Sequence, residues 1–291
     1  MPEGFLEQVI NGLMMGSIYM LVALGMVLIY GVMHVLNFAH GVLFAVGAYV
    51  CYFIFSKIID SYALAVLLSM AVLAIFGVVL EHAVFRPLRG NLRNQVIASL
   101  GLILAIENTV IWIWGPNALQ LRIPATSSIV ALGELRFNLH LLVVIAVTLF
   151  VVFALFSFLK FTRLGTAIRA TSQSAEAALV VGIPVERVHR FTFALSAALA
   201  ALGGALLGPL FLVFPTMGDE PLVKGLAGIV LGGMGSVPGA VIGALLIGIV
   251  EAVSTLYFPT DYRNSVAFMV IVLVLLVRPQ GLFGVRVRGE D

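Results

Sequence analysis

Eight apolar runs, separated by short polar segments, dominate this sequence. A helix needs about 20 consecutive apolar residues to cross the hydrocarbon core of a bilayer. Charged residues make up 10% of the 291 residues, whereas a soluble domain carries about 25%. The sequence therefore predicts an all-α fold, a polytopic transmembrane helical bundle with about eight spans. The expected spans are 9–33, 38–56, 62–83, 95–115, 139–159, 191–214, a compound region at 222–257, and 264–278.

The compound region 222–257 differs from the other runs because it is rich in glycine and interrupted in its middle. The interruption reads GGMGSVPG over 232–239. The part before it is too short to span a bilayer, whereas the part after it is long enough. Two interpretations follow. The region forms one bent helix with a surface turn, or it forms a broken or re-entrant helix whose free backbone groups are buried in protein or line a cavity.

The distribution of basic residues predicts how the chain is oriented. The 84–94 segment holds three arginines and no acid, and 160–190 holds five Lys and Arg residues against two acids. Basic loops of this kind stay in the cytoplasm. Both segments, and the tail with Arg286 and Arg288, are therefore expected there, with the C-terminus in the cytoplasm and the N-terminus outside. The 116–138 segment then faces outward, where its composition suggests a folded flap.

The usual sequence signatures of catalysis are absent. The chain contains no GxxxxGK[ST] loop to cradle a phosphate, no His/Cys cluster with zinc spacing and no GxSxG elbow. We therefore expect no catalytic residue, no metal site and no cofactor in this chain.

A polar motif at the start of the second run is a candidate translocation pathway or gate. Asn37 is a good N-cap residue, and a helix beginning there presents free N–H groups and the positive end of its dipole. Such an end suits an anionic group such as a carboxylate. His40 adds a donor one turn further on, and Gly41 follows it. The alternative is a helix cap beside a histidine packed between helices.

Acidic residues inside the apolar runs are further candidates. A charge in the middle of a bilayer costs roughly 2.5–3.5 kcal/mol on insertion scales, so it needs a polar partner or a wet cavity. Glu107 lies near the middle of its run, whereas Glu81 is expected at the membrane interface. Glu107 belongs either to the pathway or to a hydrogen bond between helices. Gly233 and Gly235 join the pathway candidates because a broken helix there would line a cavity.

The polar segment 161–190 contains a short alanine-rich stretch that Gly182 and Pro184 close. This pattern indicates a short helix with a firm stop. On the cytoplasmic face of a membrane protein, such a helix is suited to contact with a partner, although a solvated amphipathic loop would also explain it. Its residues Glu176-Ala177-Ala178, followed after three residues by Gly182, resemble the EAA loop of ATP-binding-cassette importer permeases.

The wider chain resembles one branch of these permeases, the LivH-type permeases of branched-chain amino acid importers. The matching stretches follow one another along nearly the whole chain. They are 11–13, 16–17, 30–31, 37–41, 47–49, 86–87, 163–165, 169–170, 231–240, 251–252 and 278–281.

The resemblance implies that 1–291 is a single transmembrane permease domain of a bacterial cytoplasmic (inner) membrane, with 161–190 as its cytoplasmic coupling loop. It implies transport of leucine, isoleucine or valine by alternating access. The implied partners are a LivM-type second permease, two ATPase subunits that bind ATP and Mg, and an extracytoplasmic solute-binding protein. The residues implied to couple the chain to the ATPases are Arg169, Glu176, Ala177, Ala178, Gly182, Ile183 and Pro184.

One residue departs from the family pattern. The family commonly has an acid after the 37–41 motif, where this chain has Val42. This bears on the substrate, because urea and short-chain amide permeases carry similar motifs. A second alternative is a proton-coupled secondary transporter that uses Glu107 and Glu251 as a relay.

Overall fold

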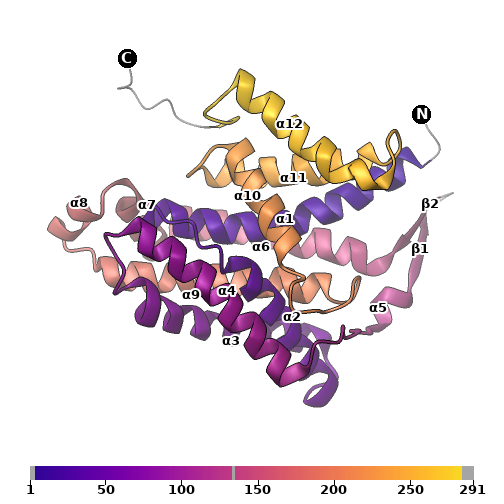
Figure 1. Ribbon diagram of the computed structural model, residues 1–291, viewed down its shortest axis with the longest axis horizontal. Coiled ribbons are helices and arrows are strands. Elements are labelled where there is room, and N and C mark those ends of the chain that lie inside the picture. The colour runs from indigo at the N-terminus through magenta and orange to yellow at the C-terminus, as the bar shows by residue number, and fades with distance from the viewer. Residues whose placement is uncertain (1–3, 133–134, 284–291) are drawn as a thin grey trace.

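The computed structural model describes residues 4–132 and 135–283, which form helices in the order that the apolar runs predict (Figure 1). Eight helical segments are long and apolar enough to cross a membrane. They are α1 (Phe5–Met33), α2 (His40–Lys57), α3 (Tyr62–Leu80) with the π-helical turn Glu81–Phe85, α4 (Leu92–Trp114), α6 (Leu139–Phe161), α9 (Val185–Leu207), α11 (Val237–Ser254), and α12 (Arg263–Val277) with the 3₁₀ turn Thr260–Tyr262. The predicted all-α polytopic bundle is confirmed.

A two-stranded hairpin occupies the segment predicted to be a folded flap. Strand β1 (Ile129–Leu132) pairs antiparallel with β2 (Leu135–Asn138), after the short helix α5 (Pro124–Ser127). Earlier in the same segment, Leu119 forms a β-bridge with Val213, which lies between α9 and the next helix. The flap is therefore tied to the connection that follows α9.

The two ends of the bundle differ in charge. Helices α7 (Arg163–Gln173) and α8 (Ala175–Val180) lie at one end, and the hairpin lies at the other (Figure 1). The 84–94 segment shares the end with α7 and α8, because Arg86 forms a 2.6 Å ion pair with Glu186 at the start of α9. We refer to this as the basic end and to the opposite one as the hairpin end.

The described part of the chain begins and finishes at opposite ends of the bundle. Helix α1 starts at the hairpin end (Figure 1). After α12, the chain returns to the basic end, where the N–H of Leu282 donates to the carbonyl oxygen of Leu231 at 2.8 Å. The basic tail residues Arg286 and Arg288 lie outside the described residues.

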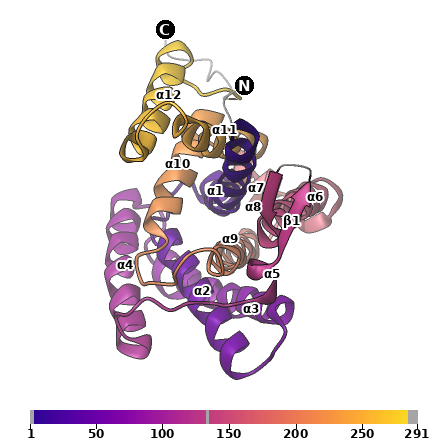
Figure 2. The same cartoon turned by 90° about the vertical axis from the view of Figure 1, so that its right-hand side faces the viewer.

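Helices α1 and α9 form the centre of the bundle, and α4 and α12 lie at its edge (Figure 2). Of the most apolar part of α1, 89% is buried, compared with 11% for α4 and for the last span. Helix α1 approaches α11 closely at Gly12, where a Cβ atom would lie 2.7 Å from the Cα of Ile249. Small residues permit such close packing between membrane helices. The exposed apolar surface of the outer helices is the kind that contacts lipid.

The 222–257 region forms a broken helix. Helix α10 (Asp219–Gly232) has 14 residues and ends at a turn of four residues before α11. At 1.5 Å per residue, α10 is about 21 Å long, too short for the roughly 30 Å core of a bilayer. It packs antiparallel against α11, since a Cβ at Gly228 would lie 2.7 Å from the Cα of Ala244. This confirms the broken helix and not the single bent one.

Candidate functional site: a helix junction, a coupling helix and a buried ion network

Two helices begin side by side, α2 inside the bundle and α10 at a position where its first two residues are exposed. Helix α2 begins at His40, whose Nδ1 lies 3.4 Å from the Oγ of Ser196, at the middle of α9. Helix α10 begins after Gly218, whose carbonyl oxygen is so close to Gly41 that a Cβ there would lie 2.9 Å from it. The positive ends of two helix dipoles therefore lie side by side. The end of α2 is buried, whereas the end of α10 carries two acids of its own, Asp219 and Glu220. We call this contact the helix junction.

The structure brings Asn37, His40 and Gly41 together at the helix junction. Asn37 is 1% exposed, and its Oδ1 accepts a hydrogen bond of 3.1 Å from the N–H of Ala39, in the turn before α2. The predicted N-cap role of Asn37 is wrong, because α2 begins at His40 and Ala39 takes the cap position. The Nδ2 of Asn37 has no hydrogen-bond partner among the described residues. Buried donors are usually paired, so this one is available to a group that enters the junction.

Glu107 lies to one side of the helix junction, on α4. Its side chain is partly exposed. Because α4 is an outer helix, Glu107 lies at the edge of the bundle and not at its centre.

The two glycines predicted for the pathway lie elsewhere, in the turn between α10 and α11 at the basic end. Gly233 and Gly235 have φ angles of 107° and 88°, which residues other than glycine rarely adopt. Gly235 lines a cavity of about 370 Å³ together with Arg169 of α7 and with Tyr30 and His34 at the end of α1. The structure therefore groups Gly235 with the predicted coupling residue Arg169 and not with Asn37 and His40.

Helix α8 has well-formed signals at both of its ends. The Oγ of Ser174 accepts a hydrogen bond of 3.1 Å from the N–H of Ala177, which caps the N-terminus. At the C-terminus, Gly182 has φ +82°, and the N–H of Ile183 donates to the carbonyl oxygen of Ala178 at 2.9 Å. This bond and the one from the Gly182 N–H to Leu179 form a Schellman motif. The predicted short helix with a glycine stop is confirmed.

The surface of α8 is unusual because it exposes a cluster of apolar side chains. Leu179, Val180 and Val181 are 58%, 88% and 74% exposed, and they stand at the tip of the basic end. Glu176 and Ala177 are also exposed, whereas Ala178 is buried and Pro184 begins the return to α9. Exposed apolar clusters with a polar rim commonly mark protein contacts.

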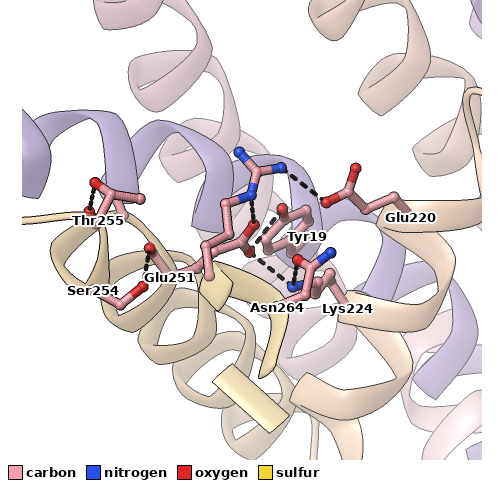
Figure 3. Close-up of polar contacts among 9 residues, drawn as sticks. Tyr19, Glu220, Lys224, Glu251, Ser254, Thr255 and Asn264 are labelled. Atoms are coloured by element: carbon pink, nitrogen blue, oxygen red, sulfur yellow. Dashed lines mark hydrogen bonds and ion pairs between the residues drawn. The ribbon is translucent and has the colours of Figure 1, made fainter. Parts of the chain in front are cut away.

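Sequence reasoning missed a buried ion network near the hairpin end (Figure 3). The Nζ of Lys224, on α10, lies 3.2 Å from Oε2 of Glu251 on α11 and donates to Oδ1 of Asn264 on α12 at 2.6 Å. Lys224 is 2% exposed and Glu251 is 3% exposed. The hydroxyl of Tyr19, on α1, donates to the same Glu251 oxygen at 3.0 Å. Four helices therefore meet at one carboxylate.

Arg263 extends this network toward the surface. Its Nε lies 2.9 Å from Oε1 of Glu251, and its terminal nitrogen lies 3.0 Å from Oε1 of Glu220. Lys224 itself was the missed signal, because a lysine inside an apolar run needs an acidic partner. Sequence reasoning also missed the partner of Glu81, which is fully buried at the end of α3 and paired with Arg89.

Comparison with known proteins identifies the family. Residues 8–275 match the family described as the branched-chain amino acid transport system / permease component. The chain belongs to this family. It is 34% identical over 294 residues to the high-affinity branched-chain amino acid transport system permease protein LivH of Escherichia coli, an alignment that covers 96% of each chain. It is also 34% identical over 302 residues to the corresponding permease protein BraD of Pseudomonas aeruginosa, covering 98% of each.

A more distant relative shares only part of the chain. The ribose import permease protein RbsC of Haemophilus influenzae is 32% identical over 126 residues, which is 41% of this chain and 39% of RbsC. No solved structure matches the chain. The family is a permease component of a transport system, so this chain is a multi-pass membrane permease and not an enzyme.

Proposed function

We propose that this chain is one of two permease subunits of an ATP-binding-cassette importer that carries leucine, isoleucine or valine across a bacterial cytoplasmic membrane. The observation that carries this proposal is the end-to-end similarity to LivH and BraD, over 96% and 98% of the chain. The proposed partners are a LivM-type second permease, two ATPase subunits that bind ATP and Mg, and an extracytoplasmic solute-binding protein. The basic end would face the cytoplasm, and the hairpin end would face the binding protein.

The proposed mechanism is alternating access driven from the basic end. The exposed surface of α8 would dock on an ATPase subunit, and closure of the ATPase pair would move α8 and α7. Helix α7 is packed tightly on the end of α6, since a Cβ at Gly165 would lie 2.6 Å from the Cα of Leu159. It also lines the basic-end cavity with Gly235, next to the turn that begins α11. A movement of α7 would displace the turn between α10 and α11 and, with it, α10. Displacement of α10 would in turn change the helix junction at Gly41 and Gly218.

The binding energy for this cycle would come from the partners. A ligand shifts a conformational equilibrium only when it interacts differently with the two states. ATP would provide that difference at the ATPase pair, so this chain needs only a rigid link between α8 and the helix junction. Helices α10 and α11, joined by a short glycine turn, are suited to move as a unit.

The proposal is tested by purification of the assembled transporter and by transport in proteoliposomes. A tagged chain, extracted in mild detergent, is expected to bring with it an ATP-binding-cassette ATPase and a second permease that mass spectrometry identifies. With the binding protein added outside and ATP inside, the proteoliposomes are expected to accumulate radiolabelled leucine. Purification of the chain alone after cross-linking, together with leucine uptake that ignores ATP, would reject the proposal.

Val42 is the observation that favours a second candidate substrate, urea or a short-chain amide. This residue, placed where relatives of this type commonly have an acid, is 3% exposed in the first turn of α2. An apolar group at this position removes a charge from the helix junction. Competition by urea and acetamide against leucine uptake in the same proteoliposomes separates the two substrates. The proton-coupled alternative has less support, because three donors already hold Glu251.

A further inference from the structure

Two adjoining cavities near the hairpin end form one cleft between the start of α1, the connection after α9, and the beginning of α12. Their volumes are about 90 Å³ and 240 Å³, and they share three lining residues, Met15, Phe211 and Arg263. We call the combined space the outer cleft. Its smaller part is lined mainly by Met15, Tyr19, Leu207, Phe211, Phe214 and Met217. Its larger part adds Gln8, Asn11, Glu251 and Thr255.

One side of the outer cleft is strongly apolar and open. Phe211 and Phe214 are 50% and 39% exposed, and Met217 is buried behind them. Large apolar side chains exposed around a hollow commonly mark a binding site. An apolar wall of this kind accepts an aliphatic group and disfavours a charged one, because the charge would lose its water without gaining a partner.

The other side of the outer cleft carries one partly exposed cation and one partly exposed anion. The side chains of Arg263 and Glu220 are 37% and 47% exposed, and their ion pair measures 3.0 Å. An exposed ion pair contributes little to stability. A ligand that carries both charges can therefore take the place of this contact with little loss of stability. Behind them, Glu251 is 4% exposed in its side chain and stays paired with Lys224. The Nε of Arg263 also stays 2.9 Å from Oε1 of Glu251, so only the contact between its terminal nitrogen and Glu220 can exchange for a ligand.

The position of the outer cleft relates it to the helix junction. Met217, in its wall, directly precedes Gly218, whose backbone contacts Gly41. Glu220 and Pro221, also in the wall, belong to the first turn of α10. A molecule in the outer cleft therefore contacts residues on both sides of the N-terminus of α10.

We propose that the outer cleft binds the amino acid as a zwitterion, with its carboxylate on Arg263, its ammonium on Glu220 and its branched side chain against Phe211 and Met217. The proposal rests on the proposed function, because it names the contact that the permease itself makes with its substrate on the hairpin side. The Arg263–Glu220 pair opens to receive the two charges of the ligand, so the site presents matched charges without a net charge. An arginine is well suited to a carboxylate because its planar fork can donate two hydrogen bonds.

The first test detects weak binding directly. The purified assembled transporter, without binding protein, is mixed with leucine, and saturation-transfer NMR is recorded on the leucine methyl protons. A signal is expected for leucine, and a signal at least fivefold weaker is expected for leucinamide, which lacks the carboxylate, and for 4-methylpentanoate, which lacks the ammonium. Equal signals from all three compounds would show apolar contact only and would overturn the proposal.

Matched variants assign the signal to the outer cleft. Met217→Trp fills the apolar wall, and Arg263→Gln and Glu220→Gln each remove one charge, so each is expected to lower the leucine signal at least fivefold. Leu104→Trp is the control, because Leu104 is 65% exposed on α4 and lies outside the outer cleft. A leucine signal that persists in all three cleft variants would place the contact elsewhere. Arg263→Lys, which keeps the charge, is expected to recover part of the signal.

Transport in the same preparation separates this inference from the proposed function. Wild-type proteoliposomes with binding protein and ATP report whether the chain imports leucine at all. Met217→Trp is expected to lower the uptake of leucine relative to valine, because a pocket distinguishes one methylene by roughly 10- to 200-fold. ATP-driven uptake with an unchanged leucine-to-valine ratio in Met217→Trp would reject the outer cleft and leave the importer intact. Absence of ATP-driven uptake in the wild type would reject both.

Discussion

The charged residues at the two ends of this bundle are used in opposite ways. Near the hairpin end, the buried Glu251 receives contacts from three side chains of its own chain, including Lys224 at 3.2 Å. At the basic end, α8 exposes Glu176 beside three apolar residues that are also exposed. The first region satisfies its charges internally and joins four helices. The second leaves its groups open, as an interface does before its partner arrives.

We propose that this difference separates residues that hold the fold from residues that act on partners. Changes in the ion network should therefore appear first as loss of stability. Changes in α8 should leave the bundle intact and appear as loss of communication with the ATPases. Three substitutions test this separation, in order of their expected effect on stability.

Lys224→Met should have the largest effect. It removes the buried cation and leaves Glu251 with less compensation, and breaking one partner of a buried ion pair costs about 3–5 kcal/mol. The measurement is thermal unfolding of the purified chain in detergent, followed by tryptophan fluorescence.

The control for Lys224→Met removes the opposite charge as well. The double variant Lys224→Met with Glu251→Met replaces the pair by apolar side chains and should recover much of the lost stability, because hydrophobic replacement of a buried pair is often neutral. Equal destabilisation in the single and double variants would mean that the packing of the lysine chain, and not its charge, holds these helices together.

Gly182→Val should have an intermediate effect that is confined to the basic end. Valine in the left-handed conformation that Gly182 adopts, φ +82°, costs roughly 1–2 kcal/mol. The Schellman motif that ends α8 would open, and the exposed residues Leu179 to Val181 would lose their arrangement. The bundle should keep its unfolding temperature, while ATPase activity stimulated by the binding protein should fall.

Asparagine provides the comparison for Gly182→Val. It tolerates the left-handed region better than other residues with side chains, so Gly182→Asn should retain most of the ATPase response. If the valine and asparagine variants behave alike, the conformation of residue 182 is unimportant and its size is what matters.

Much of this architecture follows from the sequence because it depends on local patterns. The eight spans follow from the length of the apolar runs, and the interruption of 222–257 follows from its glycines, although the choice between a bent and a broken helix does not. The stop of α8 follows from Gly182, whose left-handed conformation is a property of a single residue. These signals can be interpreted without knowledge of the rest of the fold.

The candidate site was harder to predict from the sequence because it depends on residues that are far apart in the chain. Tyr19 and Glu251 are 232 positions apart, and Lys224 and Asn264 are 40 apart. Glu81 and Arg89 are only 8 positions apart, but they pair because the chain turns back between α3 and α4. The fact that α2 begins inside the bundle depends on its contacts with α9 and α10. No local pattern specifies such pairings.

Glu176→Ala should have the smallest effect on stability and a clear effect on function. Glu176 is exposed on α8, and surface substitutions of this type usually change stability by less than about 0.5 kcal/mol. If Glu176 contacts an ATPase subunit, its loss should lower the ATPase response to the binding protein by about tenfold, which corresponds to about 1.4 kcal/mol of docking free energy. Gln173→Ala is the matched control, because Gln173 is equally exposed at the end of α7 but lies outside the Glu176–Gly182 motif. An unchanged ATPase response in Glu176→Ala, or a loss of thermal stability comparable to that of Lys224→Met, would remove the distinction between the two ends of the bundle.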